Sequence, residues 1–202
     1  MMSGERVVLD LSHLPLHGEK TASVTWWGTA AFMLIEGTGF ALVIAMYLYL
    51  AGIAPQWPID APPPSLGPGT AVTLVLLASL VPNALVMRWA GREELGKLRI
   101  ALIVMVLFGV APLVLRAFEF PALHIKWDRN AYGSVTWLLL GLHTTHLITD
   151  LGETLVLTVL MFTRHGKNKR RSGDAEDNAL YWYFVVITWL PIYGILYWLP
   201  RL

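Results

Sequence analysis

Five ionisable side chains lie inside two of the apolar stretches of this sequence. One of them, Glu36, stands about 11 residues into the stretch Thr25–Gly52. The other four belong to the stretch Ala131–Phe162: His143, His146, Asp150 and Glu153. At 100° per residue of α-helix these four fall within about 80° of one another, so they form one stripe. We call these four residues the polar stripe.

Carboxylates and histidines that face one another across a helix bundle are the usual ligands of a metal site. Such a site needs ligands at the same depth on several helices, and Glu36 is the only carboxylate that another stretch offers at mid-depth. We therefore expect the polar stripe to make structural hydrogen bonds and this chain to bind no metal. Metal binding, proton exchange and contacts to lipid headgroups stay open as alternatives.

A second pair of charges, Arg116 and Glu119, lies near the end of another apolar stretch. Residues three positions apart are neighbours on one helix face. The spacing predicts a structural ion pair, which a polar group of the stretch Ala131–Phe162 could share.

The composition indicates that these charged side chains lie inside a membrane, where charge is costly. Of the 202 residues, 55% are hydrophobic and only 14% are charged, against about 25% in soluble domains. Stretches of 20 or so apolar residues can cross a hydrocarbon core roughly 30 Å thick. The sequence therefore predicts an all-α, five-span membrane bundle, with spans at about Thr25–Gly52, Thr70–Trp89, Leu98–Phe120, Ala131–Phe162 and Ala179–Leu199.

The segments between the spans are rich in proline or charge. Residues 54–69 are predicted to form an extended loop, because consecutive prolines cannot hold a helix. Residues 163–178 are predicted to form a basic loop before the last span. Residues 1–24 are interpreted as a cytoplasmic tail and residues 25–202 as the membrane domain. Cysteine is absent, which excludes disulfides, Fe–S clusters and cysteine-ligated haem.

Lysine and arginine are distributed unevenly between the two sides. Positive charge accumulates on the cytoplasmic side of membrane proteins. The side of the N-terminus holds eleven basic residues: Arg6, Lys20, Arg88, Arg92, Lys97, Arg99, Arg164, Lys167, Lys169, Arg170 and Arg171. The other side holds four: Arg116, Lys126, Arg129 and Arg201. This bias predicts a cytoplasmic N-terminus, a periplasmic C-terminus and a place in the bacterial inner membrane. Net charge is only +1, which gives no indication of nucleic-acid binding.

Glu36 is predicted to lie near mid-membrane, roughly 16 Å of helix rise into its span. An ionised carboxylate without a partner would be very costly there. We expect Glu36 to be largely protonated at neutral pH and to face a lipid-filled cleft. The alternative is an ion pair with His143 or His146.

Three stretches together resemble subunit III of the haem–copper oxidases, over about Trp26–Trp198. In the first span, Glu36 precedes an aromatic-rich half-helix, as in that family. LRAFEF, followed by AYGSVTWLLLGLHTTHLI, is similar to the family's Leu-Gln-Ala-x-Glu-Tyr and its Tyr-Gly-Ser segment that leads into Gly-Phe-His-Gly-x-His. ALYWYFVVITWLPIYGILYW is similar to the family's final helix. The span count matches the five-span bacterial form.

The chain departs from the family pattern at several positions. Tyr183 and Val186 replace the family's His and Asp in the last helix, and Thr144 replaces a glycine. Arg116 stands where Gln is usual, and two acids of the polar stripe are additions: Asp150 and Glu153. The resemblance is therefore to a divergent member.

The resemblance implies a non-catalytic subunit of a respiratory terminal oxidase that reduces O2 and pumps protons. It implies contact with subunit I and subunit II, haem and copper in those partners and none here, and a cleft that holds phospholipid near Glu36. Either cytochrome c or quinol would fit as electron donor. Two alternatives stay open: a subunit-III-like accessory protein of nitric oxide reductase, and a free-standing membrane enzyme or transporter that uses the polar stripe with Glu36.

Overall fold

A computed structural model describes residues 24–167 and 169–202, and all regular structure within them is helical. Five helices are long and apolar enough to cross a membrane. They are α1 (Val24–Ile53), α2 (Leu66–Gly91), α3 (Leu95–Glu119), α4 (Ala131–Phe162) and α5 (Lys169–Tyr193), the last continued by a π-helical turn (Gly194–Trp198) and a 3₁₀ turn (Leu199–Arg201). Short 3₁₀ turns also form at Pro121–Leu123 and Arg164–Lys167. The all-α, five-span fold predicted from the sequence is confirmed.

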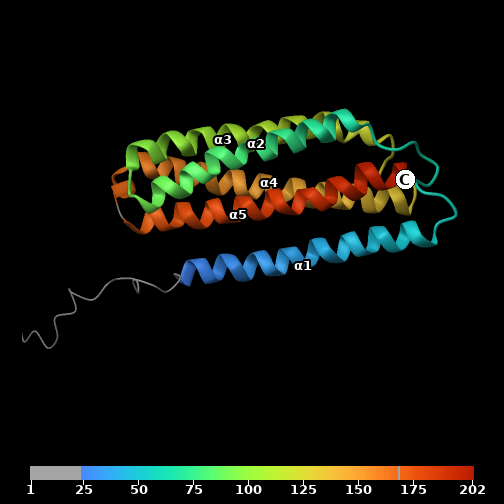
Figure 1. The fold of residues 1–202 in the computed structure, drawn as a ribbon, viewed down its shortest axis with the longest axis horizontal. Coiled ribbons are helices and arrows are strands. Elements are labelled where there is room, and N and C mark those ends of the chain that lie inside the picture. Colours follow the sequence, from blue (N-terminus) through green and yellow to red (C-terminus); the bar gives the residue numbers. More distant parts are fainter. Residues whose placement is uncertain (1–23, 168) are drawn as a thin grey trace, which may run out of the picture.

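Four of the helices close into a bundle, and α1 stands at its side (Figure 1). Helix α2 packs against α3 and α5, while α4 packs against α3 and α5 from the opposite side. Helix α1 contacts α4 and α5 and buries only Phe40 and Tyr47 completely. The remaining surface of α1 is largely exposed and apolar, as expected for a helix that faces lipid.

The start of α1 and the C-terminus lie at opposite ends of the bundle, as an odd number of spans requires (Figure 1). The tail predicted at residues 1–24 lies outside the described residues except for Val24, which already belongs to α1. Which end faces the cytoplasm stays a prediction.

Two predicted boundaries were wrong. Helix α5 begins at Lys169, ten residues before the span expected from Ala179, so most of the predicted basic loop is helical. A run of charged residues is typical of a loop, but Arg171 and Asp174, three residues apart, form an ion pair at 2.7 Å that stabilises the helix there. Helix α2 begins at Leu66, four residues before the start expected at Thr70. Pro68 does not prevent this, because it lies in the first turn, where a missing backbone N–H costs nothing.

The loop before α4 makes a close backbone contact that only glycine permits. A Cβ atom added to Gly133 would lie 2.3 Å from the carbonyl oxygen of Lys126. Asn130 caps the helix by accepting a hydrogen bond from Gly133 N at 2.9 Å, and the Ser134 hydroxyl donates to the Trp127 carbonyl at 2.7 Å. The short Tyr-Gly-Ser segment therefore fixes where α4 starts.

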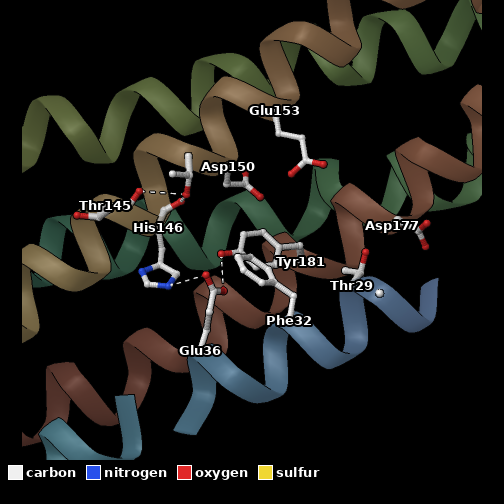
Figure 2. A pocket seen from close by; sticks show the side chains of 11 residues that line it. Thr29, Phe32, Glu36, Thr145, His146, Asp150, Glu153, Asp177 and Tyr181 are labelled. Carbon is white, nitrogen blue, oxygen red and sulfur yellow. Dashed lines mark hydrogen bonds and ion pairs between the residues drawn. The ribbon is translucent and has the colours of Figure 1, made fainter. Parts of the chain in front are cut away.

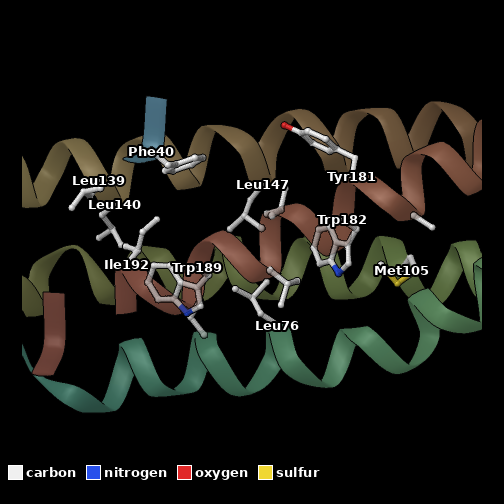
Figure 3. Packing of buried hydrophobic residues seen from close by; sticks show 14 of the residues in the cluster. Phe40, Leu76, Met105, Leu139, Leu140, Leu147, Tyr181, Trp182, Trp189 and Ile192 are labelled. Carbon is white, nitrogen blue, oxygen red and sulfur yellow. The ribbon is translucent and has the colours of Figure 1, made fainter. Parts of the chain in front are cut away.

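Two buried indoles of α5 hold the centre of the bundle (Figure 3). Trp182 donates a hydrogen bond to the Ser79 hydroxyl at 2.7 Å, and Trp189 donates to the Thr73 hydroxyl at 2.8 Å. Both acceptors belong to α2. An indole N–H in a membrane core needs an acceptor from a neighbouring helix. These contacts fix the rotation of α5 and, with it, the side chains described next.

Candidate functional site

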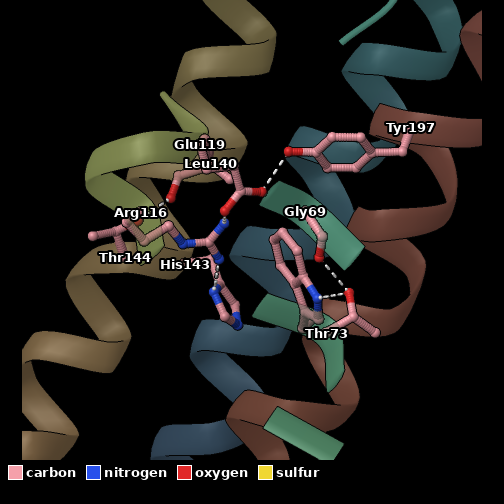
Figure 4. Close-up of polar contacts among 9 residues, drawn as sticks. Gly69, Thr73, Arg116, Glu119, Leu140, His143, Thr144 and Tyr197 are labelled. Carbon is pink, nitrogen blue, oxygen red and sulfur yellow. Dashed lines mark hydrogen bonds and ion pairs between the residues drawn. The ribbon is translucent and has the colours of Figure 1, made fainter. Parts of the chain in front are cut away.

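Arg116 and Glu119 form the predicted ion pair, and α4 shares it as expected (Figure 4). Arg116 Nη1 lies 2.5 Å from Glu119 Oε2, and Arg116 Nη2 lies 2.8 Å from Nδ1 of His143. The Arg116 guanidinium also stacks on Trp189, 4.1 Å from the ring centroid. The side chains of Arg116, Glu119 and His143 are each at most 2% exposed.

The hydrogen bonds assign the protonation of His143. Arginine has only donors, so His143 Nδ1 accepts from Arg116. Its Nε2 lies 3.1 Å from the Val185 carbonyl of α5 and must donate to it. His143 is therefore a neutral imidazole that joins α3, α4 and α5.

The C-terminal turn closes the same network. The Tyr197 hydroxyl donates a hydrogen bond to Glu119 Oε1, and Arg201 donates to the carbonyl groups of Tyr197 and Pro64. Glu119 thus accepts one bond at each oxygen, from Arg116 and Tyr197. Groups with such fixed partners in a buried site hold helices together and are not poised for chemistry.

Glu36 lies in a different set of contacts, between α1, α4 and α5 (Figure 2). Its Oε1 lies 3.2 Å from Nε2 of His146, and its Oε2 accepts a hydrogen bond from the Tyr181 hydroxyl at 2.7 Å. Phe40 packs on the His146 ring with centroids 4.8 Å apart. The pairing with His146 corresponds to the alternative raised for Glu36 from the sequence.

One proton must lie between Glu36 and His146. His146 Nδ1 is 2.7 Å from the Leu142 carbonyl, which can only accept, so Nδ1 carries a proton. If Nε2 were then unprotonated and Glu36 ionised, two lone pairs would face each other at 3.2 Å. The pair is therefore either a carboxylate with an imidazolium or a carboxyl group with a neutral imidazole.

A cavity of about 420 Å³ adjoins this pair and is lined by α1, α4 and α5. Its polar lining residues are Thr29, Glu36, Thr145, His146, Thr149, Asp150, Glu153, Asp177 and Tyr181. Asp150 is only 1% exposed, and its Oδ1 has no hydrogen-bond partner in the described part of the chain. We call this space the Glu36 cavity.

The polar stripe is thus divided between two networks. His143 points to Arg116, while His146, Asp150 and Glu153 line the Glu36 cavity. Two ionisable residues of the cavity were not singled out from the sequence. Asp177 lies in the predicted basic loop, and Tyr181 belongs to a helix whose aromatic residues gave no sign of which one would meet Glu36.

The ionisable side chains of the Glu36 cavity are not arranged as the ligands of a metal ion. Within residues 24–167 and 169–202, no group of three or more His, Asp or Glu side chains is close enough to hold a metal ion.

Comparison with known proteins identifies the family. Residues 15–200 match the family model described as cytochrome c oxidase subunit III. The chain belongs to the cytochrome c oxidase subunit III family. The match extends through all five long helices.

Individual relatives agree over most of the chain. The cytochrome c oxidase subunit 3 of Thermostichus vulcanus is 25% identical over 181 residues, covering 86% of this chain and 87% of the relative. The probable cytochrome c oxidase subunit 3 of Mycobacterium bovis is 28% identical over 180 residues, covering 84% and 85%. The cytochrome c oxidase subunit 3 of Drosophila yakuba is 26% identical over 183 residues, covering 85% of this chain and 68% of the relative.

These findings support the haem–copper oxidase reading of the sequence. They do not favour a nitric oxide reductase accessory protein or a free-standing enzyme or transporter. A protein of this family is one subunit of a larger oxidase complex in a membrane.

Proposed function

We propose that this chain is the non-catalytic subunit III of a respiratory haem–copper terminal oxidase. The single observation that carries the proposal is the family match at residues 15–200, which covers the helices α1 to α5. The haem and copper that reduce O2 would belong to subunits I and II. This chain would stabilise subunit I and hold phospholipid beside it, in a bacterial inner membrane with its N-terminus in the cytoplasm.

Two features of the molecule favour a structural, non-catalytic role for this chain. The Arg116 network is committed to joining helices, because each of its charged groups has a partner. The loosely packed α1 leaves a cavity against α4 and α5 that carries Glu36 at mid-depth. The exposed apolar face of α1, outside this cavity, is a suitable place for a bound phospholipid.

The test is purification of the chain from its own membranes through a C-terminal affinity tag. We expect co-purification of a larger haem- and copper-containing polypeptide, phospholipid in the eluate after extensive washing, and O2 consumption with either reduced cytochrome c or quinol. Membranes from an untagged strain, carried through the same column, are the control. Recovery of the tagged chain as a single polypeptide without haem would refute the proposal.

A further inference from the structure

A second cavity continues from the Glu36 cavity toward the end of the bundle where α1 begins. It has a volume of about 510 Å³ and is lined by α1, α4 and the first turns of α5. The two cavities share lining residues, which are Gly28, Thr29, Glu153 and Asp177. Together they extend from Arg171 and Asp174 near the start of α5 to Glu36 at mid-depth.

Carboxyl groups outnumber cations along this path. Five described lining residues carry a carboxyl group, namely Glu36, Asp150, Glu153, Asp174 and Asp177. Two can carry positive charge, and both already have an acidic partner: Arg171 pairs with Asp174 and His146 with Glu36. Asp150, Glu153 and Asp177 form no ion pair in the described part of the chain.

Such groups are stabilised either by being neutral or by contact with water. An ionised carboxylate in an apolar setting without a cation is prohibitively costly, whereas contact with water removes most of the penalty. Cavities of this size have room for several water molecules. Asp150 lines the Glu36 cavity, and its buried Oδ1, which has no hydrogen-bond partner among the described residues, is the kind of atom that bound water satisfies. Figure 2 shows Asp150 and Glu153 on the same side of the cavity, following one another along α4.

We propose that the two cavities form one water-filled access path, by which protons reach the Glu36–His146 pair from the end of the bundle where α1 begins. In this path the Asp150 carboxylate takes a proton from a hydronium ion, which becomes water, and passes it through a bound water to the pair. The pair then consists of a carboxyl group beside an imidazolium, and the reverse transfer returns the proton to water. No other bond forms or breaks. The charged groups facing the path are the five carboxyl groups with His146 and Arg171. The inference goes beyond the proposed oxidase role, since it concerns a cavity of this chain alone.

Hydration can be tested by cysteine labelling, because the chain has no cysteine of its own. Thr149 lines the Glu36 cavity, while its neighbour Ile148 at nearly the same depth is 55% exposed on the bundle exterior and does not line it. In permeabilised membranes holding the whole complex, a trimethylammonium methanethiosulfonate should modify T149C about tenfold or more faster than I148C, because only a hydrated thiol forms the reactive thiolate. The anionic sulfonate reagent should react more slowly with T149C than the cationic one. T29C, on the α1 side of the path, gives the same reading if T149C does not accumulate.

A lipid-filled cavity would give the opposite result. In that case T149C and T29C would react only with an apolar maleimide, at the rate of I148C, and the proposal would be wrong. This outcome would leave co-purification with a haem-containing partner unaffected, so the two proposals fail separately.

The relay role of Asp150 has its own readout. Infrared spectroscopy, with E36Q as the reference for band assignment, follows hydrogen–deuterium exchange at Glu36. Asp150→Asn should slow this exchange about tenfold or more, because an amide cannot accept and release the proton. Glu176→Gln, at an acid of α5 that lines neither cavity, should leave it unchanged. Equal exchange rates in Asp150→Asn and the wild type would exclude Asp150 as a relay.

Discussion

Gly69 on α2 lies directly against the ring of Tyr197, so that a Cβ atom at position 69 would come 2.4 Å from Tyr197 Cζ. The ring cannot move aside freely, because its hydroxyl is bonded to the buried Glu119. The last turn of the chain is therefore fixed by the absence of a side chain on the second helix.

Gly69→Ala should destabilise the protein by about 1–3 kcal/mol, the usual cost of overpacking a filled core. The measurement is the thermal unfolding midpoint of the purified complex in detergent. Gly67→Ala is the matched control, since a Cβ at this neighbouring position meets no atom within 4 Å. An equal midpoint for the two variants would show that Tyr197 is not held where the structure places it.

The Arg116 network predicts a non-additive pair of substitutions. Arg116→Met leaves Glu119 buried without its cation, which should cost about 3–5 kcal/mol. The double variant Arg116→Met, Glu119→Met removes both charges and should recover much of the loss in thermal stability. If the double variant were as unstable as the sum of the single ones, the ion pair would not be the coupling between these residues.

Arg116→Gln places at this position the residue that the family pattern has. We expect it to be milder than Arg116→Met in the same unfolding assay, because an amide N–H can still donate to Glu119 or His143. Loss of the complex in Arg116→Gln but not in Arg116→Met would contradict this reading.

Glu36→Gln should assemble normally, because the amide carbonyl can still accept from Tyr181 and its NH₂ can donate to a neutral His146. Glu36→Ala removes both contacts and should reduce the yield of assembled complex more strongly. Infrared difference spectra between wild type and Glu36→Gln then show where the shared proton lies. Loss of a protonated-carboxyl band in Glu36→Gln would support the form with a neutral imidazole. Loss of a carboxylate band would support the ion pair with His146.

The orientation of the chain can be tested by labelling with a thiol reagent that does not cross membranes. Asp128 and Gly96 are exposed at opposite ends of the bundle, and a Cβ at Gly96 meets no other atom within 4 Å. In intact cells D128C should react at once and G96C only after lysis. Ser172 is a poor reporter, because it is 8% exposed within α5. The reverse pattern would overturn the predicted topology.

The sequence was sufficient for the fold, since five apolar stretches in one chain have few alternatives. It also predicted the pairing of Arg116 with Glu119 and its contact with α4, because residues three apart on one helix face must be neighbours. The division of the polar stripe was not predictable. His143 and His146 differ by only about 60° in helix direction, and the side on which each finds a partner depends on how α1, α3 and α5 pack around α4.

The start of α5 shows the opposite difficulty. Residues 169–178 carry charges that are typical of a loop in a hydropathy pattern, but the helix extends beyond the apolar segment. Asp177 reaches the cavity only because of this extension. Only the helical spacing of the charged residues before the apolar segment could have placed Asp177 on α5.

The bond between Tyr181 and Glu36 joins residues 145 positions apart in the chain. A ribosome that adds about 5–20 residues per second needs roughly 7–30 seconds to make the second partner after the first. His146 comes 110 positions after Glu36 and is made only about three quarters of the way through this interval, so for most of it the carboxyl group of α1 has neither partner. Biogenesis of this protein therefore depends on water, lipid or the insertion machinery to shelter Glu36 until α4 and α5 arrive.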